Sequence, residues 1–393
     1  MTRSASRSIL PALSPEEAEQ SASVANLIRE RIRAAGGAVT FESFMESALY
    51  APGYGYYSAG AAKIGATGDF VTAPEVSDLF GRCVARQCAQ VLSETGGGIL
   101  ELGAGTGRLA ATLLETLSEL GALPDRYAIL EVSADLADRQ RAHLQKLPVA
   151  LRERVVWLDR LPDETLRGVI LANEVLDALP FNRIALRDGA MRELGVTLEG
   201  DGFAECEREP SDELLRAWSS VAAELPVPLP DGYRSELCQR VEPWIAGVGE
   251  CLERGLFLLF DYGLPRSQYY HPDRVDGTLR CHFKQRAHDD PFVNVGVQDI
   301  TAWVDFTRVA EGAVAANLDV LGFVTQAAFL LATGIEGLAT EAGSILDRVQ
   351  RAGEARCLLL PGEMGEAFKA MALGRGLESP LTGFSLQDLR RSL

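Results

Sequence analysis

The chain has 393 residues, of which 47% are hydrophobic, so it can bury the core of one large domain or two smaller ones. Its formal net charge of -17 argues against a nucleic-acid-binding protein, which would need a basic surface to neutralise phosphates. No apolar run approaches the roughly 20 residues that cross a bilayer, so we expect no membrane span.

Seven cysteines are scattered along the chain without a Cys-x-x-Cys pair, which favours a reduced, cytoplasmic chain over a disulfide framework. None of the four histidines has metal-ligand spacing, so no structural metal site is predicted. The first 14 residues contain Arg3 and Arg7 and no acid, which faintly resembles a transit peptide. Because no arginine-rich amphipathic helix follows, a bacterial N-terminus is the favoured interpretation.

The first part of the chain, residues 1–97, is predicted to form an N-terminal helical and lid segment. Ser14 can cap its first helix, and Pro15 suits the first helical position. A loop rich in glycine and tyrosine follows the second helix, and long loops in compact domains are often functional. The predicted elements are helices over 14–35, 40–49 and 74–92 and a loop over 51–70.

From Gly98 onwards, short apolar strands alternate with amphipathic helices, which predicts an α/β fold with a parallel sheet and helices on both faces. We expect a mostly parallel, seven-stranded sheet. The predicted strands are 99–102, 127–131, 155–158, 168–172, 256–260, 320–325 and 368–373, and the predicted helices are 108–120, 134–147 and 306–317.

About 80 residues separate the fourth and fifth strands. Residues 183–207 alternate in polarity around two hairpin turn signals, Asp188-Gly189 and Asp201-Gly202. A helix over 213–225 and a proline-rich break follow. We therefore predict an inserted α+β subdomain that faces the substrate. The predicted domain boundaries are 98–182 for the first part of the core, 183–254 for the insertion and 255–393 for the second part of the core.

The strongest local signal is the run Glu101-Leu102-Gly103-Ala104-Gly105-Thr106-Gly107 between a strand and a helix. Glycine lets the backbone approach a ligand, and a helix N-terminus offers unpaired N–H groups. A dinucleotide fingerprint has GxGxxG spacing, whereas this run has GxGxG after an acid. It resembles motif I of class I methyltransferases, in which the loop meets the methionine part of S-adenosylmethionine and the acid reaches its ammonium. A tight turn without a ligand is the alternative.

Two further acids follow the next strands. Glu131 lies 24 residues beyond Gly107, where a carboxylate can accept hydrogen bonds from both ribose hydroxyls of an adenosine. This position supports a nucleoside without choosing between cofactors. Asp159 could meet the adenine amino group, but a surface acid is an equal alternative, and Trp157, Leu158 or Arg160 could shape the same wall.

The fourth strand ends at Asn173, Glu174 and Asp177. The carboxyl ends of the strands border the crevice in which open α/β sheets bind ligands. Buried acids need partners, and a guanidinium or the sulfonium of the cofactor would be one. A carboxylate can hold a guanidinium through two N–H groups and help to remove a proton. We predict Glu174 as the first catalytic group and Asp177 as the second. Asn173 is assigned to both catalysis and cofactor binding. The alternative is that Asp177 caps a turn and Asn173 satisfies backbone groups.

The segment before the core can fold over the crevice and exclude water. Its candidates for cofactor or substrate contacts are Asp69, Thr72 and Glu75. Asp261-Tyr262-Gly263, after the fifth strand, opens onto the same crevice.

Other polar and aromatic residues are weaker candidates. His288 could accept a proton, although a hydrogen-bonded loop histidine is favoured. Three tyrosines are more typical of loop packing than of a cation-binding cage. They are Tyr54, Tyr56 and Tyr57.

Several motifs together resemble the MidA-type family, and the resemblance runs from about residue 40 to residue 376. The motif before the core and the one after the fourth strand are much more specific than the glycine motif. The matching segments are 70–77, 101–107, 173–180, 261–263, 298–301, 304–306, 364–366 and 368–369.

The resemblance implies a Rossmann-like class I methyltransferase with S-adenosyl-L-methionine as cofactor. Mitochondrial members of the family are identified as protein-arginine methyltransferases that support assembly of respiratory complex I by modifying a core subunit. The resemblance therefore implies a protein acceptor with an arginine side chain, and a complex I subunit is one candidate. A small-molecule methyltransferase and a non-catalytic assembly factor are the alternatives, and the oligomeric state is open.

Overall fold

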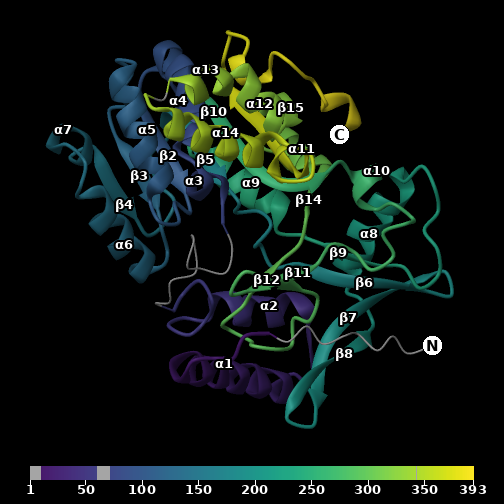
Figure 1. Ribbon diagram of the computed structural model, residues 1–393. Helices are drawn as coiled ribbons and strands as arrows, with labels where there is room; N and C mark the ends of the chain where they lie inside the picture. The colour runs from purple at the N-terminus through teal and green to yellow at the C-terminus, as the bar shows by residue number, and fades with distance from the viewer. Residues whose placement is uncertain (1–9, 60–70, 342) are drawn as a thin grey trace.

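A mixed sheet of short apolar strands forms the centre of the structure, a computed structural model that describes residues 10–59, 71–341 and 343–393 (Figure 1). The strand order is β15-β16-β10-β5-β2-β3-β4, and the short β14 (Val304–Asp305) also pairs with β10. The strands from β10 to β4 are parallel, and β16 is antiparallel to both of its neighbours. The predicted mostly parallel sheet is confirmed. Its strands are β2 (Gly98–Leu102), β3 (Tyr127–Leu130), β4 (Val155–Leu158), β5 (Leu166–Asn173), β10 (Leu252–Leu264), β15 (Asp319–Thr325) and β16 (Phe368–Arg375).

Helices cover both faces of this sheet, because successive side chains of a strand point to opposite sides. In β5, Val169 and Leu171 pack into one core cluster, whereas Ile170 and Ala172 pack into another. The first cluster is covered by α4 (Asp78–Thr95), α5 (Arg108–Glu119), α12 (Gln326–Ala332), α13 (Ile335–Thr340) and α14 (Ile345–Leu359). The second is covered by α9 (Val241–Glu250) and α11 (Phe306–Ala315).

A second, antiparallel sheet is built mainly from residues between β5 and β10. Asp188 and Gly189 both have positive φ, 51° and 77°, as the predicted two-residue hairpin turn requires. The next turn occupies residues 200–201, one residue earlier than the sequence signal, with Gly200 at φ 59°. The sheet contains β1 (Ala38–Thr40), β6 (Asn182–Arg187), β7 (Ala190–Glu199), β8 (Gly202–Arg208) and β9 (Arg234–Leu237), and α8 (Asp212–Glu224) follows β8.

The N-terminal helices α1 (Pro15–Ala34) and α2 (Phe41–Tyr50) pack beside this second sheet, as Figure 1 shows. Ser14 and Glu17 form a capping box at the start of α1. The strand β1 between the helices pairs with β7, so the N-terminal segment completes the sheet of the insertion. A third, small sheet lies in the turn-rich segment. Its strands are β11 (Arg280–Phe283), β12 (Arg286–His288) and β13 (Asp299–Thr301).

Two predicted helices differ from the observed ones. The helix predicted over 74–92 is split into α3 (Ala73–Val76) and α4, because Ser77 adopts extended backbone and its hydroxyl accepts the N–H of Leu79. The helix predicted over 134–147 ends earlier, as α6 (Ala134–Leu144). The remaining short helices are α7 (Val149–Arg152), α10 (Arg266–Tyr269), α15 (Met364–Ala367), Thr382–Phe384 and Arg390–Ser392.

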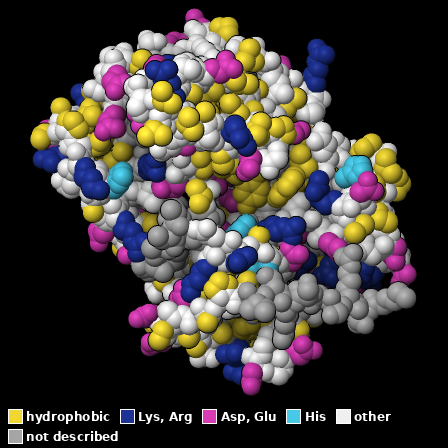
Figure 2. Space-filling model, in the orientation of Figure 1, with side chains coloured by type: hydrophobic (Ala, Val, Ile, Leu, Met, Phe, Trp, Pro, Cys, Tyr) yellow, Lys and Arg dark blue, Asp and Glu magenta, His cyan; other side chains and the backbone are white. Residues whose placement is uncertain are grey.

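The surface carries both signs of charge. On the face drawn in Figure 2, basic side chains are scattered among acidic ones over the whole surface. Within the described ranges, no helix combines the length and the apolar character that a membrane crossing requires.

Three glycines, one each from β2, β5 and β10, lie beside one another near the amino ends of these strands. Gly168 lies opposite both Gly98 and Gly255 in the sheet. A Cβ atom on Gly168 would stand 2.1 Å from the carbonyl oxygen of Gly98, and the residue has φ 126°. The close spacing of the strands therefore requires glycine, which has no side chain, at these positions.

We expect Gly168→Ala to lower the free energy of unfolding by about 2–3 kcal/mol, because the new methyl group meets fixed backbone at a positive φ. Gly337→Ala in α13 is the matched control, since a Cβ atom there meets nothing within 4 Å and alanine favours helix. Urea unfolding of both variants measures the difference. Equal stability of the two variants would contradict this role for Gly168.

Candidate active site

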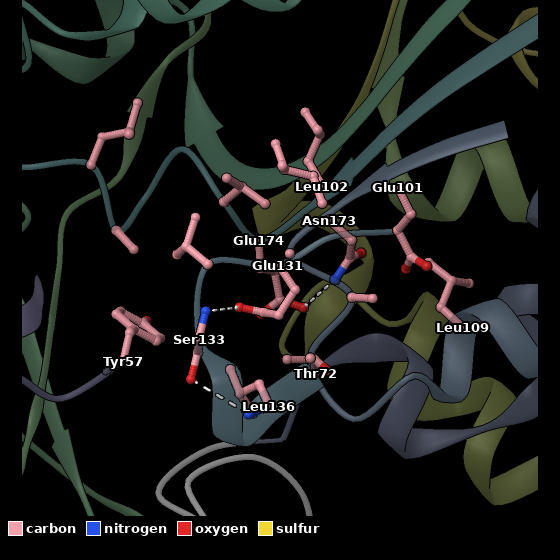
Figure 3. A pocket seen from close by; sticks show the side chains of 18 of the residues that line it. Tyr57, Thr72, Glu101, Leu102, Leu109, Glu131, Ser133, Leu136, Asn173 and Glu174 are labelled. Carbon is pink, nitrogen blue, oxygen red and sulfur yellow. Dashed lines mark hydrogen bonds between the residues drawn. The ribbon is translucent and has the colours of Figure 1, made fainter. Parts of the chain in front are cut away.

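A cavity of about 440 Å³ opens at the carboxyl ends of β2, β3 and β5 (Figure 3). Parallel neighbours in a sheet end at the same edge, so the residues that follow these strands meet around one space. Lining residues come from the glycine loop, the end of β3, the turn after β5, and from α2 and α9. The cavity thus joins the central sheet to the N-terminal helices.

The glycine loop turns along one side of this cavity. Gly103, Gly105 and Gly107 have φ values of 65°, 55° and 82°, which L side chains rarely adopt. Gly103, Ala104 and Gly105 line the cavity, as predicted for cofactor contacts. Gly107 is instead the N-cap residue of α5, and a Cβ atom there would lie 3.5 Å from Gln140.

Glu101 places a buried carboxyl group beside the loop. It lines the cavity and accepts a hydrogen bond of 2.8 Å from the hydroxyl of Tyr127. Burial raises the pKa of Glu101 to about 7. A nearby cation, such as the ammonium of an amino acid, would favour its charged form.

Glu131 follows β3 and is held from two sides. Its carboxylate accepts the backbone N–H of Ser133 at 2.9 Å and the side-chain amide of Gln140 at 2.9 Å. Gln140 also donates to the carbonyl of Gly105 and accepts from the indole of Trp157. Gln140 has no signal in the sequence, because only the packing of α6 against the loop reveals its position.

The segment before the core contacts the loop through Glu75. The hydroxyl of Thr106 donates to its carboxylate at 2.5 Å, and the guanidinium of Arg108 lies 3.7 Å from its other oxygen. Thr72 and Glu75 both line the cavity. The predicted contact from Asp69 lies outside the described residues.

The turn after β5 presents Asn173 and Glu174 to the cavity. Glu174 has φ 54°, and its backbone N–H donates to the carbonyl of Phe260 at 2.8 Å. The amide of Asn173 donates to the Glu174 carboxylate at 3.0 Å, while its own Oδ1 atom is buried without a partner among the described residues. Burial, and then the charge of Asp177, raise the pKa of Glu174 to about 8.

Asp177 takes a different position from its predicted catalytic one. It is 7% exposed, receives a hydrogen bond of 2.7 Å from the hydroxyl of Tyr262, and is absent from the described lining of the cavity. The carboxylate of Asp261 accepts the N–H groups of Leu176 and Asp177 at 3.0 and 3.3 Å. These contacts tie the turn to β10, and the carboxylate that caps the turn is that of Asp261 rather than that of Asp177, which the structural alternative named.

Two other candidates lie away from the cavity lining in the described residues. Asp159 is exposed beyond β4, whereas Leu161 lines the cavity in the region predicted for adenine. The predicted contact between Asp159 and adenine therefore has no support from this geometry. The Nδ1 atom of His288 on β12 accepts the N–H of Asp290, which fits a structural loop histidine.

The end of the cavity near α2 contains residues that the sequence analysis did not assign to the site. Glu46 and Tyr50 come from α2, and Trp244 comes from α9. Arg240 also lines the cavity and pairs with two carboxylates of α2. Tyr57 reaches the cavity as well, whereas Tyr54 is exposed and Tyr56 is buried in the N-terminal core.

These groups fit S-adenosylmethionine, which joins a methionine ammonium, a ribose and an adenine. Glu101 would hold the ammonium and Glu131 the ribose hydroxyls, while the loop backbone meets the methionine part. Leu136 and Leu161 supply apolar surface for the base. In the described residues, no group of three metal-ligating side chains is placed to hold an ion.

The profile of the family of S-adenosyl-L-methionine-dependent methyltransferases matches residues 83–324. The chain belongs to this family. A Burkholderia thailandensis protein crystallised with S-adenosyl-homocysteine is 40% identical, with 98% of this chain and 100% of that chain covered and a TM-score of 0.93. S-adenosylmethionine is therefore the cofactor of this methyltransferase.

Curated relatives are similar along nearly the whole chain. The mitochondrial protein arginine methyltransferase NDUFAF7 homologue of Drosophila melanogaster is 29% identical, covering 95% of this chain and 92% of its own. The Mus musculus NDUFAF7 protein is 27% identical, covering 91% and 86%. The resemblance inferred from the motifs is confirmed.

We expect Gln140→Ala to weaken S-adenosyl-homocysteine binding about tenfold, because Glu131 and the Gly105 carbonyl both lose a hydrogen-bond donor. Asp159→Ala is the control and should bind like the wild type. Calorimetric titration of both variants checks the difference. Weaker binding by Asp159→Ala together with unchanged binding by Gln140→Ala would reverse our assignment.

Proposed function

We propose that this methyltransferase methylates an arginine side chain of a protein. The observation that carries the proposal is the Glu174 carboxyl group, which faces the cavity from a buried turn. The names of the curated relatives, which are protein arginine methyltransferases, support the same acceptor.

The acceptor end of the cavity favours a hydrogen-bond donor with positive charge. Glu174 has carboxylate oxygens oriented by the Asn173 amide, and Asn173 keeps a buried acceptor oxygen unused among the described residues. A guanidinium has five N–H donors in a planar fork and can satisfy both groups. A neutral alcohol has one O–H donor and would leave the carboxylate without a counter-charge.

The chain's own residues can orient and deprotonate such an acceptor. S-adenosylmethionine supplies the electrophilic methyl group when it is bound. Glu174 would hold two guanidinium nitrogens and align the third for attack. Its carboxylate can then accept the proton that the methylated nitrogen must lose. The raised pKa of Glu174 suits this proton transfer near neutral pH.

We further propose a subunit of respiratory complex I (NADH:quinone oxidoreductase) as acceptor, and a cytoplasmic location. The first rests on the resemblance to the MidA-type family. The second rests on the seven scattered cysteines, which are free in the structure. Mass spectrometry of complex I subunits from cells with and without the gene tests the acceptor, since a methylated arginine should disappear on deletion.

Purified wild-type protein, incubated with labelled S-adenosylmethionine and extract from deletion cells, should label arginine side chains. We expect Glu174→Gln to lower kcat/KM about a hundredfold or more, because a neutral amide neither pairs with a guanidinium nor accepts its proton. Glu164→Gln, at an exposed position, is the control. Mass spectrometry identifies the labelled atom. Labelling of a small molecule but no protein would contradict the proposal.

The raised pKa of Glu174 predicts a pH profile. Below about pH 8 the carboxyl group of the free enzyme is protonated and cannot pair with a guanidinium. At saturating cofactor, the nearby sulfonium favours the charged form of Glu174, so kcat/KM for the acceptor should rise with pH through a pKa below 8 and level off above it. Glu174→Gln should lack this rise. An identical ascending limb in both proteins would show that another group titrates.

A further inference from the structure

Two tyrosine rings form a wall at the end of the cavity near α2. Tyr50, the last residue of α2, stacks on Tyr57 with ring centroids 5.5 Å apart and an interplanar angle of 23°. Both residues line the cavity. Figure 3 shows Tyr57 across the cavity from Glu101, with Glu131 and Glu174 between them.

The hydroxyl groups fix both rings beside the Glu174 turn. Tyr50 donates at 2.9 Å to the carbonyl of Ala178, four residues after Glu174. Tyr57 donates at 2.9 Å to the carboxylate of Asp299 on β13. The rings are thus anchored to two different elements and are ordered before any ligand arrives, which limits the entropy lost on binding.

Charges of both signs lie around the rings. Arg240 and Glu46 line the same end of the cavity and pair with each other, whereas the carboxylate of Asp299 accepts the hydroxyl of Tyr57. Burial, and then the charge of Asp299, raise the pKa of Tyr57 well above its ordinary value. The phenol therefore stays protonated and donates to a carboxylate, which increases the electron density of its ring. An electron-rich ring face attracts a cation, and the attraction strengthens where water is excluded.

We propose that Tyr50 and Tyr57 form a subsite for the cationic side chain of the acceptor and direct it to Glu174. The subsite deepens the proposed function, since it rests on an arginine acceptor. A guanidinium is planar and weakly hydrated, so it stacks on aromatic faces more readily than a strongly hydrated ammonium. The rings would thereby favour arginine over a neutral side chain of the same shape.

Binding of two matched probes tests this subsite without catalysis. Nα-acetyl-arginine methylamide and its neutral citrulline counterpart are titrated by NMR into the full chain saturated with S-adenosyl-homocysteine. The wild type should bind the arginine probe at least about tenfold more tightly. Tyr57→Leu should weaken the arginine probe about tenfold and leave the citrulline probe within about twofold, because leucine fills space without an electron-rich face.

Tyr57→Phe keeps the ring and its packing but loses the donation to Asp299, so a loss of about threefold is expected for the arginine probe alone. This variant decides the question if Tyr57→Leu does not fold. Tyr54→Leu, at an exposed tyrosine of the same segment, is the control and should change neither probe. Unchanged S-adenosyl-homocysteine affinity in each variant shows that the cofactor end is intact.

Equal losses for both probes would overturn the subsite, because the rings would then only pack. Unchanged arginine binding in both Tyr57 variants, or no charge preference in the wild type, would overturn it as well. A different result would contradict the proposed function alone. If the wild type prefers the arginine probe through Tyr57 but labels no protein arginine, the subsite stands and the assigned reaction does not.

Discussion

Three carboxyl groups share one buried cavity because three parallel strands end at the same edge of the sheet. Glu101 is the penultimate residue of β2, Glu131 follows β3 and Glu174 follows β5. Burial raises the pKa of each of them. Acids in such a place are unfavourable when charged unless cations or hydrogen-bond donors accompany them. The sheet topology therefore produces a cavity in which a bound cation stabilises the charged carboxylates, and a sulfonium cofactor with a guanidinium acceptor would supply such cations.

The position of Glu174 depends on a turn that the neighbouring strand holds in place. Glu174 adopts left-handed backbone, which is unusual for a residue with a side chain. Its N–H group donates to the carbonyl of Phe260 in β10, and the carboxylate of the next residue of that strand, Asp261, accepts two further N–H groups of the turn. Tyr262 then donates to Asp177. Residues 260–262 of β10 thus hold the turn that presents Glu174 after the neighbouring β5.

Much of the central sheet could be predicted because its signals are local. Apolar runs of four to eight residues, separated by amphipathic helices, predict the strands and their parallel direction. The glycine run and Glu131 gain meaning from their positions after those strands. Ser77 shows the limit, since helical periodicity continues through a residue whose hydroxyl caps the next helix instead. The turn-rich segment that forms β11 to β13 had no comparable periodicity to reveal its strands.

Residues brought in by long-range packing could not be predicted. Gln140 reaches the carbonyl of Gly105, 35 positions away, only after α6 has packed beside the glycine loop. Tyr50 meets the carbonyl of Ala178, 128 positions along the chain, because α2 folds across the cavity. Asp177 illustrates the opposite case, since its neighbour Glu174 faces the cavity while it turns towards Tyr262. Strand-end position alone does not determine where each side chain points.

The two ends of the cavity have different structural origins. The glycine loop and Glu131 belong to the strand–helix core, whereas Tyr50 belongs to an N-terminal helix. The ion pairs of Arg240 with α2 are half-exposed, and such pairs contribute only about 0–1 kcal/mol each. Apolar contacts such as the ring stack of Phe41 on Phe181 must therefore hold α2 in place. A hydrophobic core outside the central sheet thus fixes the tyrosine wall, whereas the central sheet itself positions Glu174 and the glycine loop.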